Sequence, residues 1–182
     1  SLNWTAPSAG PLTFSAGGLY YIYPQNSSTV ATNADGSVES VSKAPADGSY
    51  QVFVKLAAAD LPLAPAVKFC HELDNTDDWI VLFTVGHGFG LTDKLALNLG
   101  AVLGFGGDYY VESNYGSGTG AAFTHAQFDA SLSYALTEKA SVAFKGSFST
   151  LLDGDLRDDV DAGGVYADQD VFFGGVNASY SF

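Results

Sequence analysis

Five charged side chains interrupt segments that are otherwise small or apolar: Lys55, Lys68, Glu72, Asp129 and Lys145. Successive side chains of a β-strand point to opposite faces, and alternation around each of the five predicts that all point to the inner face of a sheet. A desolvated lone charge is very costly, so such side chains must be hydrated or paired. Two interpretations follow. The charges line a wet passage and set its ion preference, or they pair with one another and fill the interior.

A second group of candidate residues is acidic. Between Asp153 and Asp170 the chain holds seven Asp and one base, Arg157. Close-spaced carboxylates are the hard oxygen ligands that Ca²⁺ takes, although the register lacks the Gly and Glu positions of an EF-hand. The alternative is a solvated loop, and no other cofactor is expected. The candidate calcium ligands are Asp153, Asp155, Asp158 and Asp159, with Asp161 close by.

Histidine offers a weaker case for catalysis. An imidazole beside a carboxylate can act as a general base, and His71 lies near Asp74, Asp77 and Asp78, while His125 lies near Asp129. No spacing specifically supports such a pair, and no nucleophile elbow is present. We therefore expect that the chain is not an enzyme. Cys70 is the single cysteine, which excludes an intrachain disulfide.

The elements that must position these residues are strands. Residues 95–105 place Leu95, Leu97, Leu99, Leu103 and Phe105 on one face, against small or polar residues on the other. This period of two predicts half-buried β-strands. The same pattern, cleaner toward the C-terminus, covers residues 12–23, 50–56, 67–71, 79–89, 124–136, 141–148 and 172–182, and residues 2–6 read as part of one further strand.

The predicted connections alternate in length. Short ones cover residues 7–11, 58–65, 90–94 and 137–139, and long ones cover 25–48, 112–122 and 153–169, with a briefer one at 73–78. Short turns at one rim and longer loops at the other are typical of outer-membrane barrels. The turns at 90–94 and 135–139 are near copies, which predicts one hairpin unit used twice.

The predicted fold is therefore all-β: a single domain over residues 1–182, forming an antiparallel up-and-down transmembrane β-barrel of roughly eight to ten strands. The short strand at residues 2–6 gives an odd count. It is either a lead-in to an eight-stranded barrel or a sign that N-terminal strands are missing, and the second is favoured. The main competitor is a soluble secreted β-sandwich.

Composition narrows the classes of partner and location. The net charge is −13, from 20 acidic and 7 basic residues, which argues against nucleic-acid binding and against docking on anionic lipid by charge alone. No apolar run reaches the roughly 20 residues of a transmembrane helix. The residues from Ser1 onward lack the charged and apolar regions of a signal peptide, so none is expected in them. Aromatic residues form two groups near the strand ends, as in the interfacial belts of a lipid-embedded barrel. One group is Tyr20, Tyr23, Trp79, Tyr109 and Tyr110, and the other is Phe89, Tyr180 and Phe182.

The last five residues, Ala178-Ser179-Tyr180-Ser181-Phe182, resemble the assembly signal of Gram-negative outer-membrane proteins, which ends in an aromatic residue. The stretch from His87-Gly88-Phe89-Gly90-Leu91-Thr92-Asp93-Lys94-Leu95 through Leu97-Asn98-Leu99-Gly100 is similar to bacterial putative-porin families. So is Ser149-Thr150-Leu151-Leu152-Asp153-Gly154-Asp155-Leu156-Arg157-Asp158. The resemblance covers the chain from about residue 49 onward. It implies an outer-membrane location and contact with lipid and the assembly machinery, with Tyr180 and Phe182 as signal residues, and it brings no catalytic residues.

Two functions are therefore expected. The first is a porin-like protein that passes small solutes passively, with Lys55, Lys68, Glu72, Asp129 and Lys145 lining its lumen. The second is a closed structural or interaction barrel that anchors the membrane or presents its acidic loops to a protein partner or to further copies of itself. Strand number separates the two, since eight strands leave an interior that side chains just fill.

Overall fold

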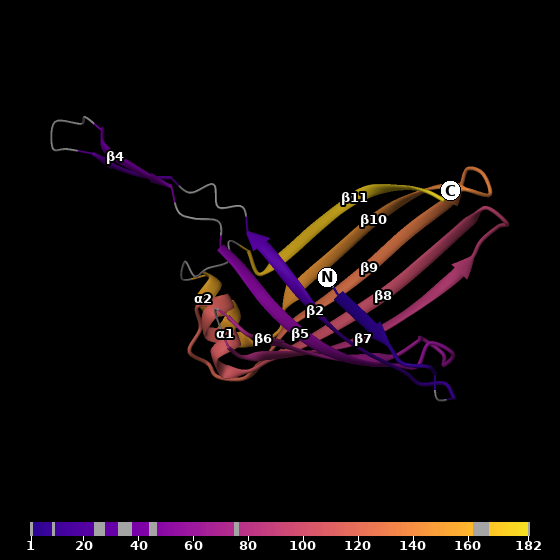
Figure 1. Cartoon of the computed structure of the whole chain (residues 1–182), viewed down its shortest axis with the longest axis horizontal. Coiled ribbons are helices and arrows are strands. Elements are labelled where there is room, and N and C mark those ends of the chain that lie inside the picture. The colour runs from indigo at the N-terminus through magenta and orange to yellow at the C-terminus, as the bar shows by residue number, and fades with distance from the viewer. Residues whose placement is uncertain are drawn as a thin grey trace.

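The protein folds around one large antiparallel sheet. The computed structural model describes residues 2–8, 10–23, 28–32, 38–43, 47–74, 77–161 and 168–181. Nine strands form the sheet in the order β1-β2-β5-β6-β7-β8-β9-β10-β11, each antiparallel to its neighbour (Figure 1). They are β1 (Leu2–Thr5), β2 (Thr13–Tyr23), β5 (Asp47–Ala57), β6 (Ala66–Glu72), β7 (Trp79–Gly90), β8 (Leu95–Gly106), β9 (Ala122–Ala135), β10 (Ala140–Leu151) and β11 (Asp170–Tyr180).

The all-β, up-and-down prediction is confirmed, because each predicted strand coincides with an observed one to within a few residues. Residues 2–6 prove to be a strand rather than a lead-in, since Leu2–Thr5 pair with Gly18 through Ser15 of β2. Alternation decides these elements: in β9 the bulky Phe128, Leu132 and Tyr134 are exposed, while Gln127 and Asp129 on either side of Phe128 are half-buried.

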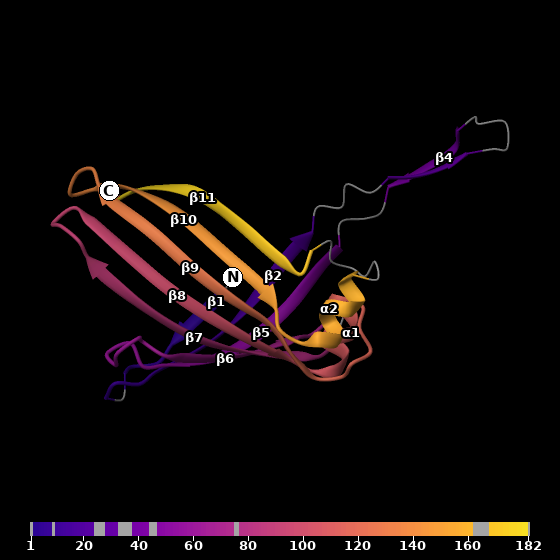
Figure 2. The ribbon, with the colours of Figure 1, turned by 180° about the vertical axis from the view of Figure 1, so that it is seen from behind.

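The sheet is strongly curved and therefore has two unlike faces (Figures 1 and 2). Side chains diverge on a convex face and converge on a concave one. The alternating exposure thus places most bulky apolar side chains on the convex face and most small and polar ones on the concave face, with Phe53, Ile80 and Leu82 as exceptions on the concave side. The closed barrel is not reached, because β1 and β11 are the two edges of the sheet and do not pair with each other. Among the described residues no second large sheet packs against the first, as a sandwich would require.

The connections alternate in length, as predicted from the sequence. At one end, β1–β2, β5–β6, β7–β8 and β9–β10 are joined by short segments. Figure 1 shows β11 finishing at this end, where the amide of Ser181 donates to the carbonyl of Lys139 over 2.8 Å. The connections at the opposite end are longer, apart from the brief β6–β7 link.

The two near-copy turns share one geometry. In the first, Thr92 Oγ1 accepts the amides of Lys94 (3.3 Å) and Leu95 (3.0 Å). In the second, Thr137 Oγ1 accepts the amides of Lys139 (3.2 Å) and Ala140 (3.0 Å). A hydroxyl that satisfies two turn amides is a Ser/Thr turn motif, so the sequence repeat does mark one hairpin unit used twice.

Three long connections contain structure that the sequence reading missed. Residues 25–48, predicted as a loop, include β3 (Ser28–Thr32) and β4 (Val38–Lys43), which pair as a separate two-stranded sheet. Both strands are rich in Val, Ser and Thr, and Val and Thr favour strands. The predicted loops 112–122 and 153–169 overlap two helices, α1 (Asp108–Tyr115) and α2 (Gly154–Asp161).

The two helices, here called the helical cap, lie together at the long-loop end of the sheet (Figure 1). Leu156 and Val111 are fully buried between them, and the small core of the cap consists of Val111, Tyr115, Ala122, Leu151, Leu156 and Val160. The acidic segment is therefore not a solvated loop throughout, because α2 buries Leu156 and Val160 four residues apart on one face. No helix in the described part of the chain is long and apolar enough to cross a membrane.

Candidate functional site

The concave face carries the five charged residues singled out from the sequence. Lys55 stands directly opposite Lys68, and Glu72 stands opposite Gln51 on the same face. Across the sheet, Asp129 stands opposite Ser147, and Lys145 stands opposite Ser131. The strand register thus places all five on one face, in two groups: Lys55, Lys68 and Glu72 on β5 and β6, and Asp129 and Lys145 on β9 and β10.

The β5–β6 group is cationic around an aromatic ring. Lys68 Nζ lies 4.4 Å from the centroid of the Phe53 ring, a cation–π contact. Phe53 in turn lies over Gly17, where an added Cβ would come within 2.8 Å of the ring. Two like charges directly opposite each other destabilise a strand pair unless water screens them. The Lys55–Lys68 pairing is therefore unfavourable unless water reaches this part of the concave face.

The β9–β10 group is built around Asp129. Its Oδ1 accepts hydrogen bonds from Gln127 Nε2 (2.8 Å) and from the Ser147 hydroxyl (2.6 Å). Asp129, Lys145 and Ser147 line a cavity of about 390 Å³ together with Asn98 and Ser131. Neutral donors satisfy the carboxylate, so it is held in place without a cation.

No ion pair with another described residue neutralises Lys55, Lys68, Asp129 or Lys145. Within the part of the chain that the structure describes, the ion pairs are His71–Asp77 (3.8 Å) and Arg157–Asp170 (3.7 Å). Glu72 accepts a hydrogen bond from the buried Ser49 hydroxyl. Lysines on a face without carboxylate partners must be solvated, which disfavours the interpretation that a salt-bridge network fills the interior.

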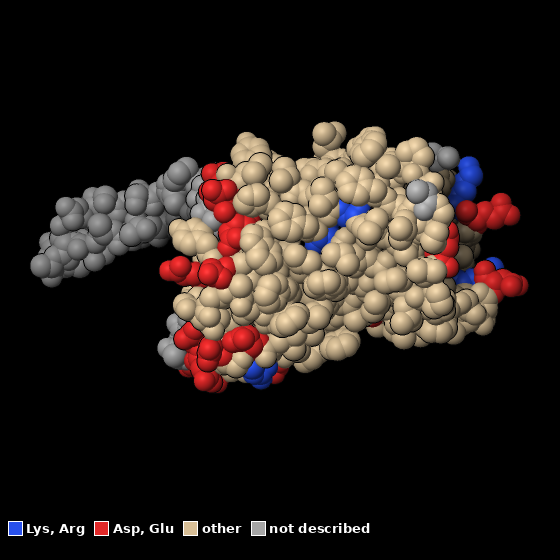
Figure 3. Space-filling model, turned by 90° about the horizontal axis from the view of Figure 1, so that it is seen from below, with Lys and Arg blue, Asp and Glu red and all other residues tan. Residues whose placement is uncertain are grey.

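The strand residues of the convex face are mostly apolar, because the charged residues of β5, β6, β9 and β10 share the opposite face. Figure 3 shows acidic side chains gathered at the two ends of the molecule, with the surface between them almost wholly uncharged apart from a small basic patch. Large hydrophobic side chains are exposed along the strands of this face, Phe128 by 56% and Phe144 by 59%. A monomeric soluble protein rarely exposes so extended an apolar patch.

A ladder of aromatic rings crosses the convex face near the helical cap. Phe69, Trp79, Phe105 and Phe123 come from the consecutive strands β6 to β9. Their neighbouring ring centroids lie 6.3, 5.8 and 5.0 Å apart. Tyr20 and Tyr50, at the same end of β2 and β5, lie 4.5 Å apart. Trp79 and Tyr20 thus lie in an aromatic row at the long-loop end, as the sequence suggested. Tyr109 and Tyr110 belong to α1 instead, and the side chain of Tyr23 lies outside the described residues.

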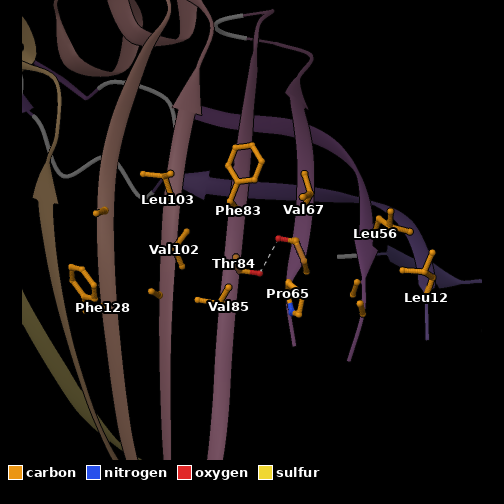
Figure 4. A pocket seen from close by; sticks show the side chains of 15 residues that line it. Leu12, Leu56, Pro65, Val67, Phe83, Thr84, Val85, Val102, Leu103 and Phe128 are labelled. Atoms are coloured by element: carbon orange, nitrogen blue, oxygen red, sulfur yellow. Dashed lines mark hydrogen bonds between the residues drawn. The ribbon is translucent and has the colours of Figure 1, made fainter. Parts of the chain in front are cut away.

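An apolar groove crosses the convex face between two rows of side chains (Figure 4). Leu56, Val67, Phe83 and Leu103 form one row because they are paired strand to strand. Val85 and Phe128 belong to the next row along the strands, and the backbone around Thr84 and Val102 lies between the two rows. The groove, of about 490 Å³, offers no charged group, so only an apolar occupant suits it.

The mouth at the cap end is held by contacts distant in sequence. Asp78 Oδ2 accepts the amide of Tyr110 over 2.7 Å, so the β6–β7 link supplies the N-terminal cap that α1 lacks at Gly107. Arg157 Nη1 donates to Thr150 Oγ1 (3.2 Å) and to the carbonyl of Leu151 (2.9 Å), tying α2 to β10. The cap is thereby fixed to the strands.

The predicted calcium residues are divided among different tasks. Asp153 Oδ1 accepts the amides of Asp155 (3.0 Å) and Leu156 (3.4 Å), which makes Asp153 the N-cap of α2. Asp155 accepts the hydroxyl of Thr119 over 2.9 Å, and Asp158 and Asp159 lie within the helix. Across the described residues, no three His, Cys, Asp or Glu side chains are grouped so that they could hold a metal ion.

Of the histidine–carboxylate pairs that the sequence allowed, the described residues contain the pair of His71 with Asp77. His71 Nδ1 lies 2.9 Å from the backbone carbonyl of Asp78, not from its carboxylate, and its Nε2 reaches only Asp77 at 3.8 Å. His125 Nδ1 lies 3.0 Å from Thr124 Oγ1, and Asp129 is bonded to other residues. Of the two assembly-signal residues, Tyr180 ends β11 opposite Ala140 and is exposed, while Phe182 lies outside the described residues.

Sequence reasoning missed the helical cap and the role of Asp78. A signal for α1 was present, because Gly107 and Gly116 flank eight residues and Gly116 adopts a left-handed φ of 74° as the C-cap. For α2, Asp153 before Leu156 and Val160 was the signal of an N-cap followed by a helical apolar spacing. The sequence held no signal for the role of Asp78, because its hydrogen-bond partner, the amide of Tyr110, lies 32 residues away.

Comparisons with known proteins do not assign the chain to a family. No protein-family model matches the chain, and no curated protein matches it significantly. The resemblance to bacterial porin-like families therefore stays a prediction.

Proposed function

We propose that this chain is the membrane-embedded sheet of a bacterial outer-membrane protein, and that it passes small solutes passively along its concave face. The observation that carries the proposal is that the distribution of apolar and polar side chains is the reverse of that in a water-soluble protein. Bulky apolar groups are exposed on the convex face, and polar and charged groups face the concave side. Transmembrane barrels alternate in this way because lipid lies outside and water inside.

Closure of the sheet is part of the proposal. Lipid offers no hydrogen bonds, so exposed sheet edges do not occur within the hydrocarbon region. Nine antiparallel strands leave β1 and β11 running in the same direction. Single-chain bacterial barrels have an even number of antiparallel strands. We therefore propose that an odd number of further strands joins the two edges in the membrane.

The unpaired lysines favour a water-filled interior. Lys55 and Lys68 face each other without a carboxylate partner among the described residues, and Asp129 is satisfied by Gln127 and Ser147. A plug made of salt bridges would pair these charges with one another. The wall of β5 and β6 then carries positive charge into the lumen, and we expect it to raise the preference for anions.

The helical cap supports a second candidate, a closed barrel that presents its rim to a partner. Tyr110 and Val111 of α1 lie against Gly106, whose strand partner Ile80 is on the concave face. The cap therefore lies at one mouth of the concave space. If it closes that mouth, its acidic exterior becomes the functional surface.

Conductance in a planar lipid bilayer separates the two candidates. The pore predicts discrete current steps whose selectivity shifts toward cations in Lys68→Glu, because a charge in the lumen attracts counter-ions. Lys94→Glu, in the β7–β8 turn, is the matched control and should leave selectivity nearly unchanged. Silence from protein shown to be inserted would contradict the pore and favour the closed barrel.

A further inference from the structure

A cavity of about 260 Å³ lies between α1 and the concave face. It is separate from the β5–β6 lysines and from the cavity around Asp129. Its walls come from β9, β10, α1, β11 and the two residues just before β11: His125, Gln127, Ser149, Leu151, Tyr110, Tyr115, Val171, Asp168 and Gln169. It is slightly smaller than the roughly 300–1,000 Å³ typical of drug-sized ligands.

Several polar side chains around this cavity use one atom in a hydrogen bond with the protein and have a second polar atom that can bond a ligand. Gln127 donates through Nε2 to Asp129, which fixes its amide and leaves Oε1 as an acceptor. Gln169 donates through Nε2 to the carbonyl of Arg157 over 3.0 Å, and its Oε1 is likewise an acceptor. His125 uses Nδ1 toward Thr124, so Nε2 can serve a ligand. Groups fixed in advance lose little entropy on binding.

These polar groups select a class of ligand. The wall combines acceptors on Gln127, Gln169 and Asp168 with the hydroxyl of Ser149 and the imidazole of His125. A ligand hydroxyl both donates and accepts, so it can satisfy every one of these groups. Among the described residues that line the cavity, Asp168 is the one carboxylate and there is no Lys or Arg, which disfavours an anion.

The remaining lining is apolar or aromatic, from Tyr110, Tyr115, Leu151 and Val171. Such surface suits the C–H groups of a ring that carries hydroxyls at its edge. We propose that this cavity binds a neutral, polyhydroxylated solute of the size of one sugar ring, at the mouth of the passage. The inference rests on the proposed function in one respect, because it requires the concave face to be reached by water.

Saturation-transfer NMR with glucose as the probe tests the site, since it detects weak binding to the full chain in detergent micelles. We expect transfer to glucose from the unaltered protein, and a roughly two- to tenfold weaker affinity in Gln127→Leu, the loss of one hydrogen bond. Ser149→Ala is a second variant and should weaken binding in the same direction. Ser131→Ala, on the concave face outside this cavity, is the matched control and should bind glucose as before.

The outcomes are decisive in both directions. Absence of transfer to glucose, or transfer unaltered in both cavity variants, would overturn the inference. Displacement of glucose by glutamate at equal concentration would also overturn it, because an anion should be excluded. Failure here is distinguishable from failure of the proposed function: a protein that conducts without binding glucose lacks this site, and one that binds glucose without conducting is not a pore.

Discussion

The two faces of the sheet differ in polarity and in exposure to solvent, although they are built from alternate residues of the same strands. Around the middle of β9 the convex side chains are Phe128, Ala130 and Leu132, and the concave ones are Gln127, Asp129 and Ser131. The polar residues are more protected from solvent than the apolar ones. In water the hydrophobic effect drives the reverse arrangement. The comparison supports the proposal that the convex face contacts an apolar solvent.

The largest predicted effect contrasts the two faces directly. In lipid vesicles, we expect Phe128→Arg to lower the free energy of unfolding by about 2–4 kcal/mol, the range for Arg near the middle of the lipid-facing band. Ser131→Arg, on the concave face, should cost much less because its guanidinium stays hydrated. Denaturant titration of both variants measures the difference. If both variants lowered the free energy of unfolding by less than about 0.5 kcal/mol, as substitutions at exposed sites in water do, the convex face would not differ from the concave face in its solvent.

The next prediction concerns crowding within the concave face. At Gly104, an added Cβ would meet His125 Cε1 at 2.6 Å and Thr124 Oγ1 at 2.7 Å, whereas at Gly175 nothing lies within 4 Å. We expect Gly104→Val to destabilise the fold by about 1–3 kcal/mol through overpacking. Gly175→Val should have little effect, since the concave face is open there. Thermal unfolding of the two variants checks the contrast, and an equal loss from both would refute an open interior.

A smaller effect is expected at the rim, where the cap joins the concave face. Asp78→Ala removes the acceptor for the Tyr110 amide and should cost about 1 kcal/mol, as for a lost N-cap. Hydrogen exchange of the α1 amides should accelerate. Asp77→Asn removes the charge that faces His71 at 3.8 Å and keeps a side chain suited to the left-handed φ of 44°, so it should change stability by less than about 0.5 kcal/mol. Unaltered exchange in Asp78→Ala would show that α1 does not depend on this contact.

The sheet was predictable because its information is local. The alternation in residues 95–105 is enough to identify β8. The two faces of a strand can be assigned from its own residues, without information from the rest of the chain. The shared face of Lys55, Lys68 and Asp129 followed from the same rule. The pairing of Lys55 with Lys68 could not be predicted in this way, because the register of two strands depends on the geometry of the turn between them.

The cap was not predictable to the same extent because its stability is not local. Helix α1 is eight residues long, too short to be stable alone in water, and it depends on Asp78 from another connection. Helix α2 contains four Asp among eight residues, a composition that favours a solvated loop over a helix. Burial of Leu156 against the first helix outweighs this preference. The glucose-sized cavity shares this dependence, since it exists only once the cap is folded.

The central claim is that the convex face contacts lipid and the concave face contacts water. Cysteine labelling in lipid vesicles tests it at neighbouring residues, in a Cys70→Ser background so that the native thiol does not react. We predict that Ser131→Cys reacts with a water-soluble maleimide, whereas Leu132→Cys reacts only with a lipid-soluble one. Reaction of Leu132→Cys with the water-soluble reagent, together with protection of Ser131→Cys, would contradict the account.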